Sequence, residues 1–145
     1  MATEKNSKIS CDEFNAMLKT DLPAVAGMGI YLCDIEFGCA EMVLPYHQNS
    51  LRPGGTISGP YMMTLADVCM FAVVLGQLGD VKLAVTTNLN INFLRKPAES
   101  DLIAKGKMLK LGKRLAVVEV SIFSEQALVA HATGTYSIPP RESAN

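Results

Sequence analysis

The chain has 145 residues, 49% of them apolar, which is enough to bury one hydrophobic core. Thirteen basic and fourteen acidic side chains give a formal net charge of −1, so no global charge attracts nucleic acid or an anionic membrane. The N-terminus is polar and no apolar run approaches the roughly 20 residues that span a bilayer, so we expect a single cytoplasmic domain over residues 1–145.

A short helix is expected close to the N-terminus. Ser10 and Glu13 have the spacing of a capping box, and apolar residues then recur at intervals of three and four. The pattern predicts a helix over about residues 10–20, and Pro23 ends it.

A hairpin and a long connection follow the helix. The segment Gly29–Leu44 alternates in polarity around a turn at Phe37–Gly38, which is typical of two paired strands. The segment Pro45–Ser58 is rich in Pro, Gly, Asn and Ser, which predicts an irregular connection. Loops of this length inside compact domains often carry function.

The segment Gly59–Leu78 is apolar around its whole circumference, with Asp67 as its only charged residue. A helix of this kind belongs inside a structure, where other elements cover it on all sides. We therefore predict a buried central helix.

Four β-like runs complete the chain, and the tail 139–145 is expected to fray. The runs are Lys82–Leu94, Leu102–Leu109, Ala116–Phe123 and Leu128–Ser137. A sheet needs one covered face and the apolar helix needs covering all round. The order of elements therefore predicts an α+β fold, in which an antiparallel sheet of about six strands wraps around one central helix.

The residues that commonly bind metals show no ligand-like spacing. The histidines, His47 and His131, lie far apart, and the four cysteines form no CxxC pair and have mostly apolar neighbours. These cysteines are Cys11, Cys33, Cys39 and Cys69. We expect them to be small buried side chains in a reducing compartment, and we expect no metal site.

The junction between the loop and the central helix carries a recognisable pattern. From Asn49 to Asp67 the chain reads NSLRPGGTISGPYMMTLAD, which resembles the signature of the PaaI-type acyl-CoA thioesterases of the hotdog superfamily. That signature has an Asn, a Gly-rich loop ending in His-Gly-Gly, and a helical Asp eight residues after the first Gly of the pair. Gly59 and Asp67 keep this separation.

The resemblance extends over about Met28 to Ile138 and implies a hotdog fold. It also implies a homodimer or homotetramer that pairs its sheets edge to edge, with active sites at the subunit interface. The implied substrate is an acyl-CoA thioester, and coenzyme A enters only as part of that substrate, without a further cofactor.

Three positions depart from the family pattern. Arg52 stands seven residues before Gly59, where the family has its polarising Asn, and Asn49 lies ten residues before Gly59. Ser58 replaces the His, and Pro60 replaces the second Gly. Proline suits the first turn of a helix, where a missing amide proton costs little.

Two residues are the expected reaction centre. The helix that starts at Gly59 aims unpaired amides and the positive end of its dipole at a thioester oxygen, whose negative charge grows in the tetrahedral intermediate. Burying the Asp67 carboxylate without partners is expensive, which favours a functional role. Asp67 acts either as a general base that activates water or as a nucleophile, and the sequence leaves both open.

Other residues are assigned supporting roles. Thr86 aligns with a family hydroxyl that orients the water or the Asp, while Thr87 points to the other sheet face. Arg52 either polarises the carbonyl or binds a carboxylate on the acyl group. The expected substrate- and CoA-binding residues are Ser58, Arg95, Lys96, Lys110, Lys113 and Arg114, the last five as a basic patch for the nucleotide phosphates.

The leading hypothesis is hydrolysis of an acyl-CoA, with the Gly59 amide and Arg52 polarising the carbonyl and Asp67 of the facing subunit activating water. Two alternatives remain. One is a hotdog enoyl-CoA hydratase or dehydratase, and the other is a non-catalytic acyl-CoA binding module. The acyl chain and the choice between dimer and tetramer stay open.

Overall fold

The computed structural model describes residues 6–140, so most of the tail predicted to fray lies outside the described residues. Helix α1 spans Cys11–Asp21 and begins with the predicted capping box: the Glu13 amide donates to Ser10 Oγ at 3.0 Å, and the Ser10 amide donates to Glu13 Oε1 at 3.1 Å. The chain then turns at Leu22 into the short helix α2, Pro23–Gly27. Pro23 therefore ends one helix by starting another, because its fixed φ suits a first helical turn.

The predicted hairpin is confirmed as strands β1, Tyr31–Glu36, and β2, Cys39–Leu44. Gly38 sits in its turn with φ +86°, a conformation that glycine adopts without strain.

The connection to the central helix is more regular than its composition indicates. It holds a 3₁₀ turn at Gln48–Ser50 and a small hairpin made of strands β3, Leu51–Arg52, and β4, Thr56–Ile57. Strands of two residues are too short to leave a periodic pattern, so the prediction of an irregular loop was wrong here.

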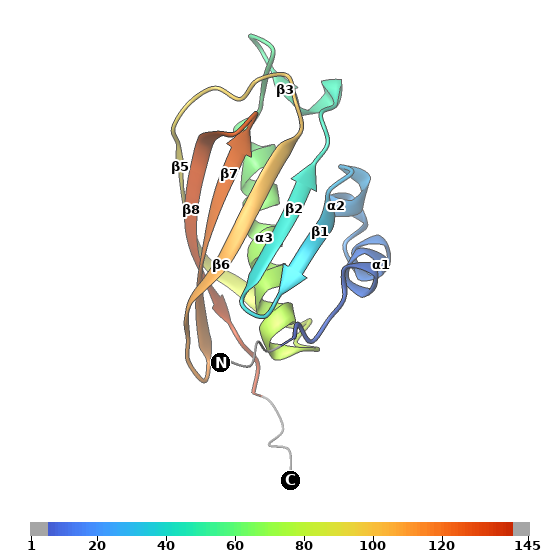
Figure 1. The fold of residues 1–145 in the computed structure, drawn as a ribbon, viewed down its shortest axis with the longest axis vertical. Helices are drawn as coiled ribbons and strands as arrows, with labels where there is room; N and C mark the ends of the chain where they lie inside the picture. The colour runs from blue at the N-terminus through green and yellow to red at the C-terminus, as the bar shows by residue number, and fades with distance from the viewer. Residues whose placement is uncertain (1–5, 141–145) are drawn as a thin grey trace.

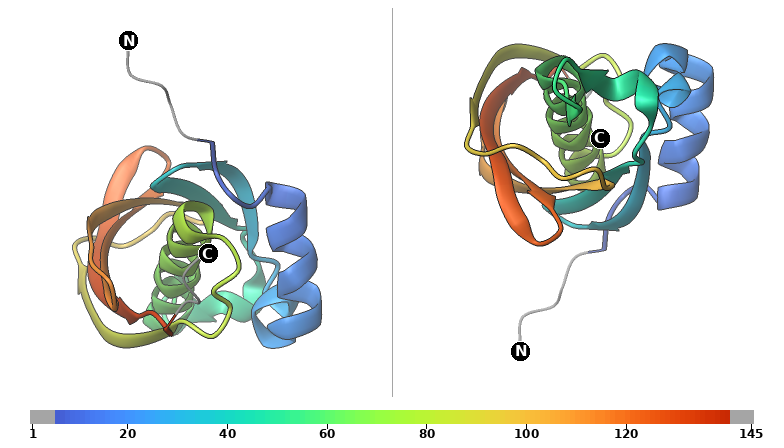
Figure 2. Two further views of the ribbon diagram at one scale, coloured as in Figure 1. Left: turned by 90° about the horizontal axis from the view of Figure 1, so that it is seen from below. Right: turned by 90° about the horizontal axis from the view of Figure 1, so that it is seen from above.

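Helix α3 spans Gly59–Leu78, as predicted, and the sheet curls around it (Figure 2). With 20 residues it is long and apolar enough to cross a membrane, which corrects the expectation that no apolar run has that length. Its most apolar stretch is 67% buried inside the fold. The sheet therefore covers the surface that a lipid bilayer would otherwise cover.

The remaining strands are β5, Val85–Phe93; β6, Leu102–Leu111; β7, Leu115–Ser124; and β8, Ala127–Ser137. Together with β1 and β2 they form one antiparallel sheet in the order β1-β2-β6-β7-β8-β5 (Figure 1). The predicted six-stranded α+β arrangement around a single helix is confirmed.

Two glycines let α3 lie close to the inner face of the sheet. A Cβ atom at Gly134 in β8 would lie 2.5 Å from Met70 Sδ, and one at Gly106 in β6 would lie 2.9 Å from Cys69 Sγ. Both glycines are therefore required by packing rather than by turn geometry.

The two edges of the sheet differ. Asn15 of α1 bonds the free edge of β1 as a strand would, accepting from the Leu32 amide at 2.8 Å and donating to the Leu32 carbonyl at 2.9 Å. Strand β5 pairs only with β8 among residues 6–140, and no residue along it is fully buried. One edge is therefore covered by α1 and α2, and the other presents an open row of backbone groups (Figure 1).

The expectation that the cysteines are buried holds for only one of them. Cys69 is buried in α3, Cys11 is partly buried, and Cys33 and Cys39 are exposed on the β1–β2 hairpin. All four are free thiols. The apolar character of the hairpin cysteines favoured burial, but strand alternation assigns the inward positions to their neighbours Leu32 and Ala40, which are buried.

Candidate active site

The Asp67 carboxylate is held by two hydroxyl groups from different strands. Thr86 Oγ1 of β5 donates to Asp67 Oδ1 at 2.6 Å, and Tyr136 OH of β8 lies 2.6 Å from the same oxygen. Both distances are typical of hydrogen bonds to an ionised carboxylate. Helix α3, one edge strand and its neighbour therefore converge on this side chain.

Asp67 borders a cavity of about 400 Å³ between α3, α2 and the start of β5. Apolar side chains from Leu22, Val25, Val68, Phe71, Ala84 and Val85 make up most of its lining. Lys82 is the cation in the lining, and its Nζ lies 3.7 Å from Asp21 Oδ2. The cavity thus offers apolar surface beside one carboxylate.

Sequence reasoning missed Tyr136. Its side chain is 3% exposed, and its ring stacks on that of Phe71 with centroids 6.2 Å apart and an interplanar angle of 16°. Burial and the neighbouring Asp67 carboxylate raise the pKa of Tyr136, so the phenol keeps its proton. Its inward-facing place in the alternation of β8 was the available signal, because a buried tyrosine hydroxyl needs a partner.

Thr86 and Thr87 take different sides, as predicted from strand alternation. Thr86 bonds Asp67, whereas Thr87 is exposed and donates to the Thr135 carbonyl at 3.2 Å. The ladder between β5 and β8 shifts register between Thr86 and Asn88, so Thr87 occupies an irregular position of the strand.

Gly59 occupies the first position of α3, and Ser58 is the N-cap without a side-chain capping bond. Pro60 contributes no amide hydrogen, and among residues 6–140 no backbone acceptor takes the Gly59 N–H. The ring of Phe93 lies against this glycine, because a Cβ atom there would come within 3.3 Å of Phe93 Cζ. The amide at the positive end of the helix is thus available to a ligand.

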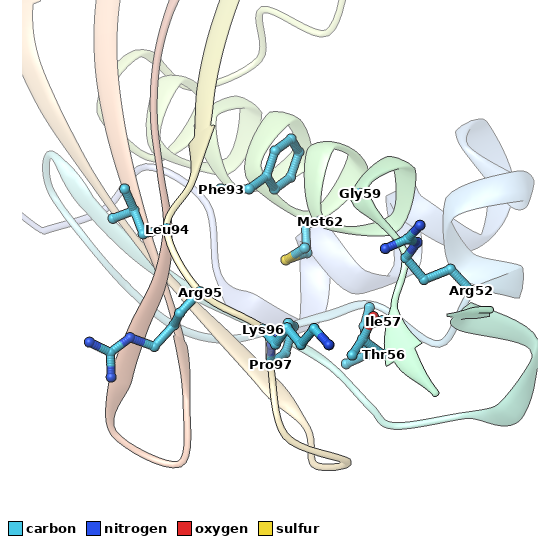
Figure 3. Close-up of a pocket in the computed structure, with 10 residues that line it drawn as sticks. All are labelled: Arg52, Thr56, Ile57, Gly59, Met62, Phe93, Leu94, Arg95, Lys96 and Pro97. Atoms are coloured by element: carbon cyan, nitrogen blue, oxygen red, sulfur yellow. The ribbon is translucent and has the colours of Figure 1, made fainter. Parts of the chain in front are cut away.

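A second cavity, of about 390 Å³, opens at Gly59 (Figure 3). Figure 3 shows the Arg52 guanidinium beside the first turn of α3. Lys96 extends towards Thr56 and Ile57, whereas Arg95 points away from them. Among the described residues, three cations and no acidic side chain line this cavity, so it suits an anionic or strongly polarised ligand.

The predicted basic patch is not continuous within one chain. Arg95 and Lys96 follow the end of β5, in the connection that leads to the start of β6, whereas Lys110, Lys113 and Arg114 lie at the far end of β6 and in the turn to β7. A ten-residue strand is about 33 Å long, so the two groups sit at opposite ends of the sheet.

Neither histidine lies beside the Asp67 carboxylate. His47 Nδ1 accepts from the Asn49 amide at 2.9 Å, and His131 Nε2 lies 3.3 Å from Glu119 Oε1. Within residues 6–140 no cluster of three His, Cys, Asp or Glu side chains is arranged to hold a metal ion.

Gly59 and Asp67 do not meet within one chain. Eight residues of helix separate them by about 12 Å along the axis. The two cavities that they line share no residue. A single thioester carbon therefore cannot contact both groups of the same chain.

Comparison with known proteins assigns the family. Residues 54–131, more than half of the chain, match the family model described as the thioesterase superfamily. The chain belongs to the thioesterase superfamily. The matched segment begins in the loop before α3 and ends in β8, so it includes the Gly59 amide, Asp67 and Thr86.

Relatives of this thioesterase-superfamily chain agree with the assignment. A candidate esterase of Thermoplasma acidophilum is 30% identical over an alignment of 126 residues, and the alignment covers 81% of this chain and 95% of that protein. A solved candidate thioesterase of a Silicibacter species is 41% identical with a TM-score of 0.82, over 92% of this chain and 94% of the other.

A third match comes from a solved candidate thioesterase of Ralstonia eutropha, described as related to phenylacetic acid degradation. It is 27% identical with a TM-score of 0.76, over 86% of this chain and 98% of the other. The predicted resemblance to PaaI-type thioesterases and the hotdog fold are thereby confirmed.

Proposed function

We propose that this protein hydrolyses acyl-CoA thioesters to a free acid and coenzyme A at a site shared by two subunits. The observation that carries the proposal is the Asp67 carboxylate, which has one oxygen held by two hydroxyl groups and borders a cavity lined in part by apolar side chains. A carboxylate of this kind is a suitable general base for water, and the apolar part of the lining suits an acyl chain.

In this proposal the thioester carbonyl oxygen accepts a hydrogen bond from the Gly59 amide. The Arg52 guanidinium, which lines the same cavity, adds positive charge near that oxygen. Water attacks the carbonyl carbon while Asp67 takes its proton. The tetrahedral intermediate then collapses, the carbon–sulfur bond breaks, and the thiolate leaves and takes up a proton as coenzyme A.

The separation of Gly59 from Asp67 supports a two-subunit site. Two copies of the open β5 edge related by a two-fold axis would run antiparallel. Full pairing of this nine-residue strand would set the Thr86 end of one copy opposite the Phe93 end of the other. Since Thr86 binds Asp67 and Phe93 contacts Gly59, the two halves of the site would then meet.

The same pairing supports a divided site for coenzyme A. Arg95 and Lys96 lie at the Gly59 end of the sheet, whereas Lys113 and Arg114 lie at the Asp67 end, where Arg114 Nε donates to the Ile138 carbonyl. An antiparallel dimer would bring the first group of one subunit towards the second group of its partner. Together they would offer the positive charge that the phosphates of coenzyme A require.

The test is thiol release from short, medium, long and aromatic acyl-CoAs by the wild-type protein and the Asp67→Asn variant. We expect release from at least one class, and a loss of at least 100-fold in the variant, because the amide cannot take the proton from water. Full turnover by a folded variant would exclude Asp67 as the base. Saturable acyl-CoA binding without thiol release would instead identify a binding module.

A further inference from the structure

The hydrogen bonds to Asp67 are unequally divided between its two oxygens. Oδ1 receives both the Thr86 and the Tyr136 hydroxyls, whereas Oδ2 accepts no hydrogen bond from any of residues 6–140. A carboxylate oxygen offers about two lone-pair sites. Oδ1 is therefore fully engaged by the protein, and Oδ2 is the oxygen left for water.

The position of Tyr136 allows it to hold Oδ1 and to leave Oδ2 free of protein donors. Its hydroxyl lies 2.6 Å from Oδ1 and 2.8 Å from the main-chain carbonyl of Asp67. One phenol has a single proton, and the shorter contact to a charged acceptor is the stronger bond. Stacking on Phe71 holds the ring plane, so the hydroxyl cannot follow a rotating carboxylate.

We infer that Tyr136 is a positioning residue that, together with Thr86, holds Asp67 Oδ1 so that Oδ2 is the oxygen that takes the proton from water. The inference rests on the proposed hydrolysis and adds to it the identity of the reacting oxygen and of the group that selects it. The two donors come from different strands, β8 and β5, so together they oppose rotation of the carboxylate about its last torsion.

The experiment compares Tyr136→Phe with Tyr31→Phe, a matched change at an exposed tyrosine of β1. We expect Tyr136→Phe to lower kcat by about 10- to 100-fold, as for the loss of one hydrogen bond to a charged group. KM should stay within about twofold. Tyr31→Phe should match the wild type in both kcat and KM. An unchanged kcat in Tyr136→Phe would overturn the inference.

A second substitution at position 136 controls for misfolding of Tyr136→Phe. Incorporating 3-fluorotyrosine at position 136 keeps the ring and the hydroxyl and makes the phenol a stronger donor. Because the donor to Asp67 is kept, kcat should stay near the wild-type value, and a loss of kcat as large as that of Tyr136→Phe would count against the inference. If Asp67→Asn loses activity while Tyr136→Phe has the wild-type kcat, only the positioning role is rejected. If Asp67→Asn is fully active, the proposed hydrolysis is rejected.

Discussion

At the scale of single residues, the main feature of the site is a carboxylate in an apolar helix, which loses part of its hydration on folding. Asp67 is only partly buried, and the Thr86 and Tyr136 hydroxyls, both at 2.6 Å, offset the lost hydration of one of its oxygens. In the proposed hydrolysis the other oxygen takes the proton from water. Structural support and the proposed reactivity are then separated within one side chain.

The two neighbouring threonines provide a prediction with an internal control. Thr86→Val removes a donor from Asp67, so we expect kcat/KM to fall by about 10-fold, in line with one charge-assisted hydrogen bond. Thr87→Val removes a hydroxyl that donates to the Thr135 carbonyl and does not contact Asp67, so activity should stay within about twofold. Steady-state thiol release measures both. Equal losses in the two variants would show that general strand stability, rather than the Asp67 contact, sets the rate.

The residues of the site differ in how far the sequence could predict them. Asp67 stands out as the single charge in an apolar run, and Thr86 follows from the family alignment. No local sequence pattern pairs Tyr136 with Asp67, because Asp67 lies 69 positions earlier in the chain and the two meet only in the folded sheet. A contact of that range cannot be read from local periodicity.

At the scale of elements, helix α3 carries both groups of the proposed reaction, an open amide at Gly59 and a carboxylate two turns later at Asp67. Its bounds could be predicted because its apolar run is long and ends at Gly79. The small β3–β4 hairpin before it could not, since its strands have two residues each. The separation of the basic residues at the two ends of β6 also required the strand pairing.

The Gly59 amide can be tested by two substitutions that differ in one hydrogen. Gly59→Pro removes the N–H at the first position of α3, and Ser58 before it has φ −72° and ψ 150°, which suits a following proline. Because Pro60 follows directly and restricts the residue before it, the fold of this variant is checked by circular dichroism before its activity is compared. Gly59→Ala keeps the N–H and adds a similar Cβ atom, which the half-exposed Phe93 ring must accommodate.

We expect kcat to fall by about 100- to 1000-fold in Gly59→Pro, the usual cost of losing an oxyanion donor. The loss in Gly59→Ala should be much smaller. Similar losses in both variants would point to obstruction of the cavity by the added atoms and would remove the amide from the mechanism.

At the scale of the whole molecule, the two sheet edges have opposite characters. Asn15 and helix α1 close the β1 edge, whereas β5 is open and is flanked by the exposed apolar side chains Val85, Phe93 and Leu94. An open edge with apolar side chains favours pairing with a second copy. Such pairing would explain why one chain holds the amide and the carboxylate in separate cavities.

The most direct test of a site shared between subunits is a subunit-mixing assay with the two variants that are expected to be inactive, Gly59→Pro and Asp67→Asn. If each site takes its amide from one subunit and its carboxylate from the other, a mixed dimer contains one site with both groups intact. Equal amounts of the two variants are unfolded and refolded together, so that half of the dimers are mixed. Each mixed dimer has one intact site of two, so the mixture should show about a quarter of the wild-type thiol release. Mixing that recovers no activity, with mixed dimers demonstrated by a tag on one variant, would contradict a site shared between subunits.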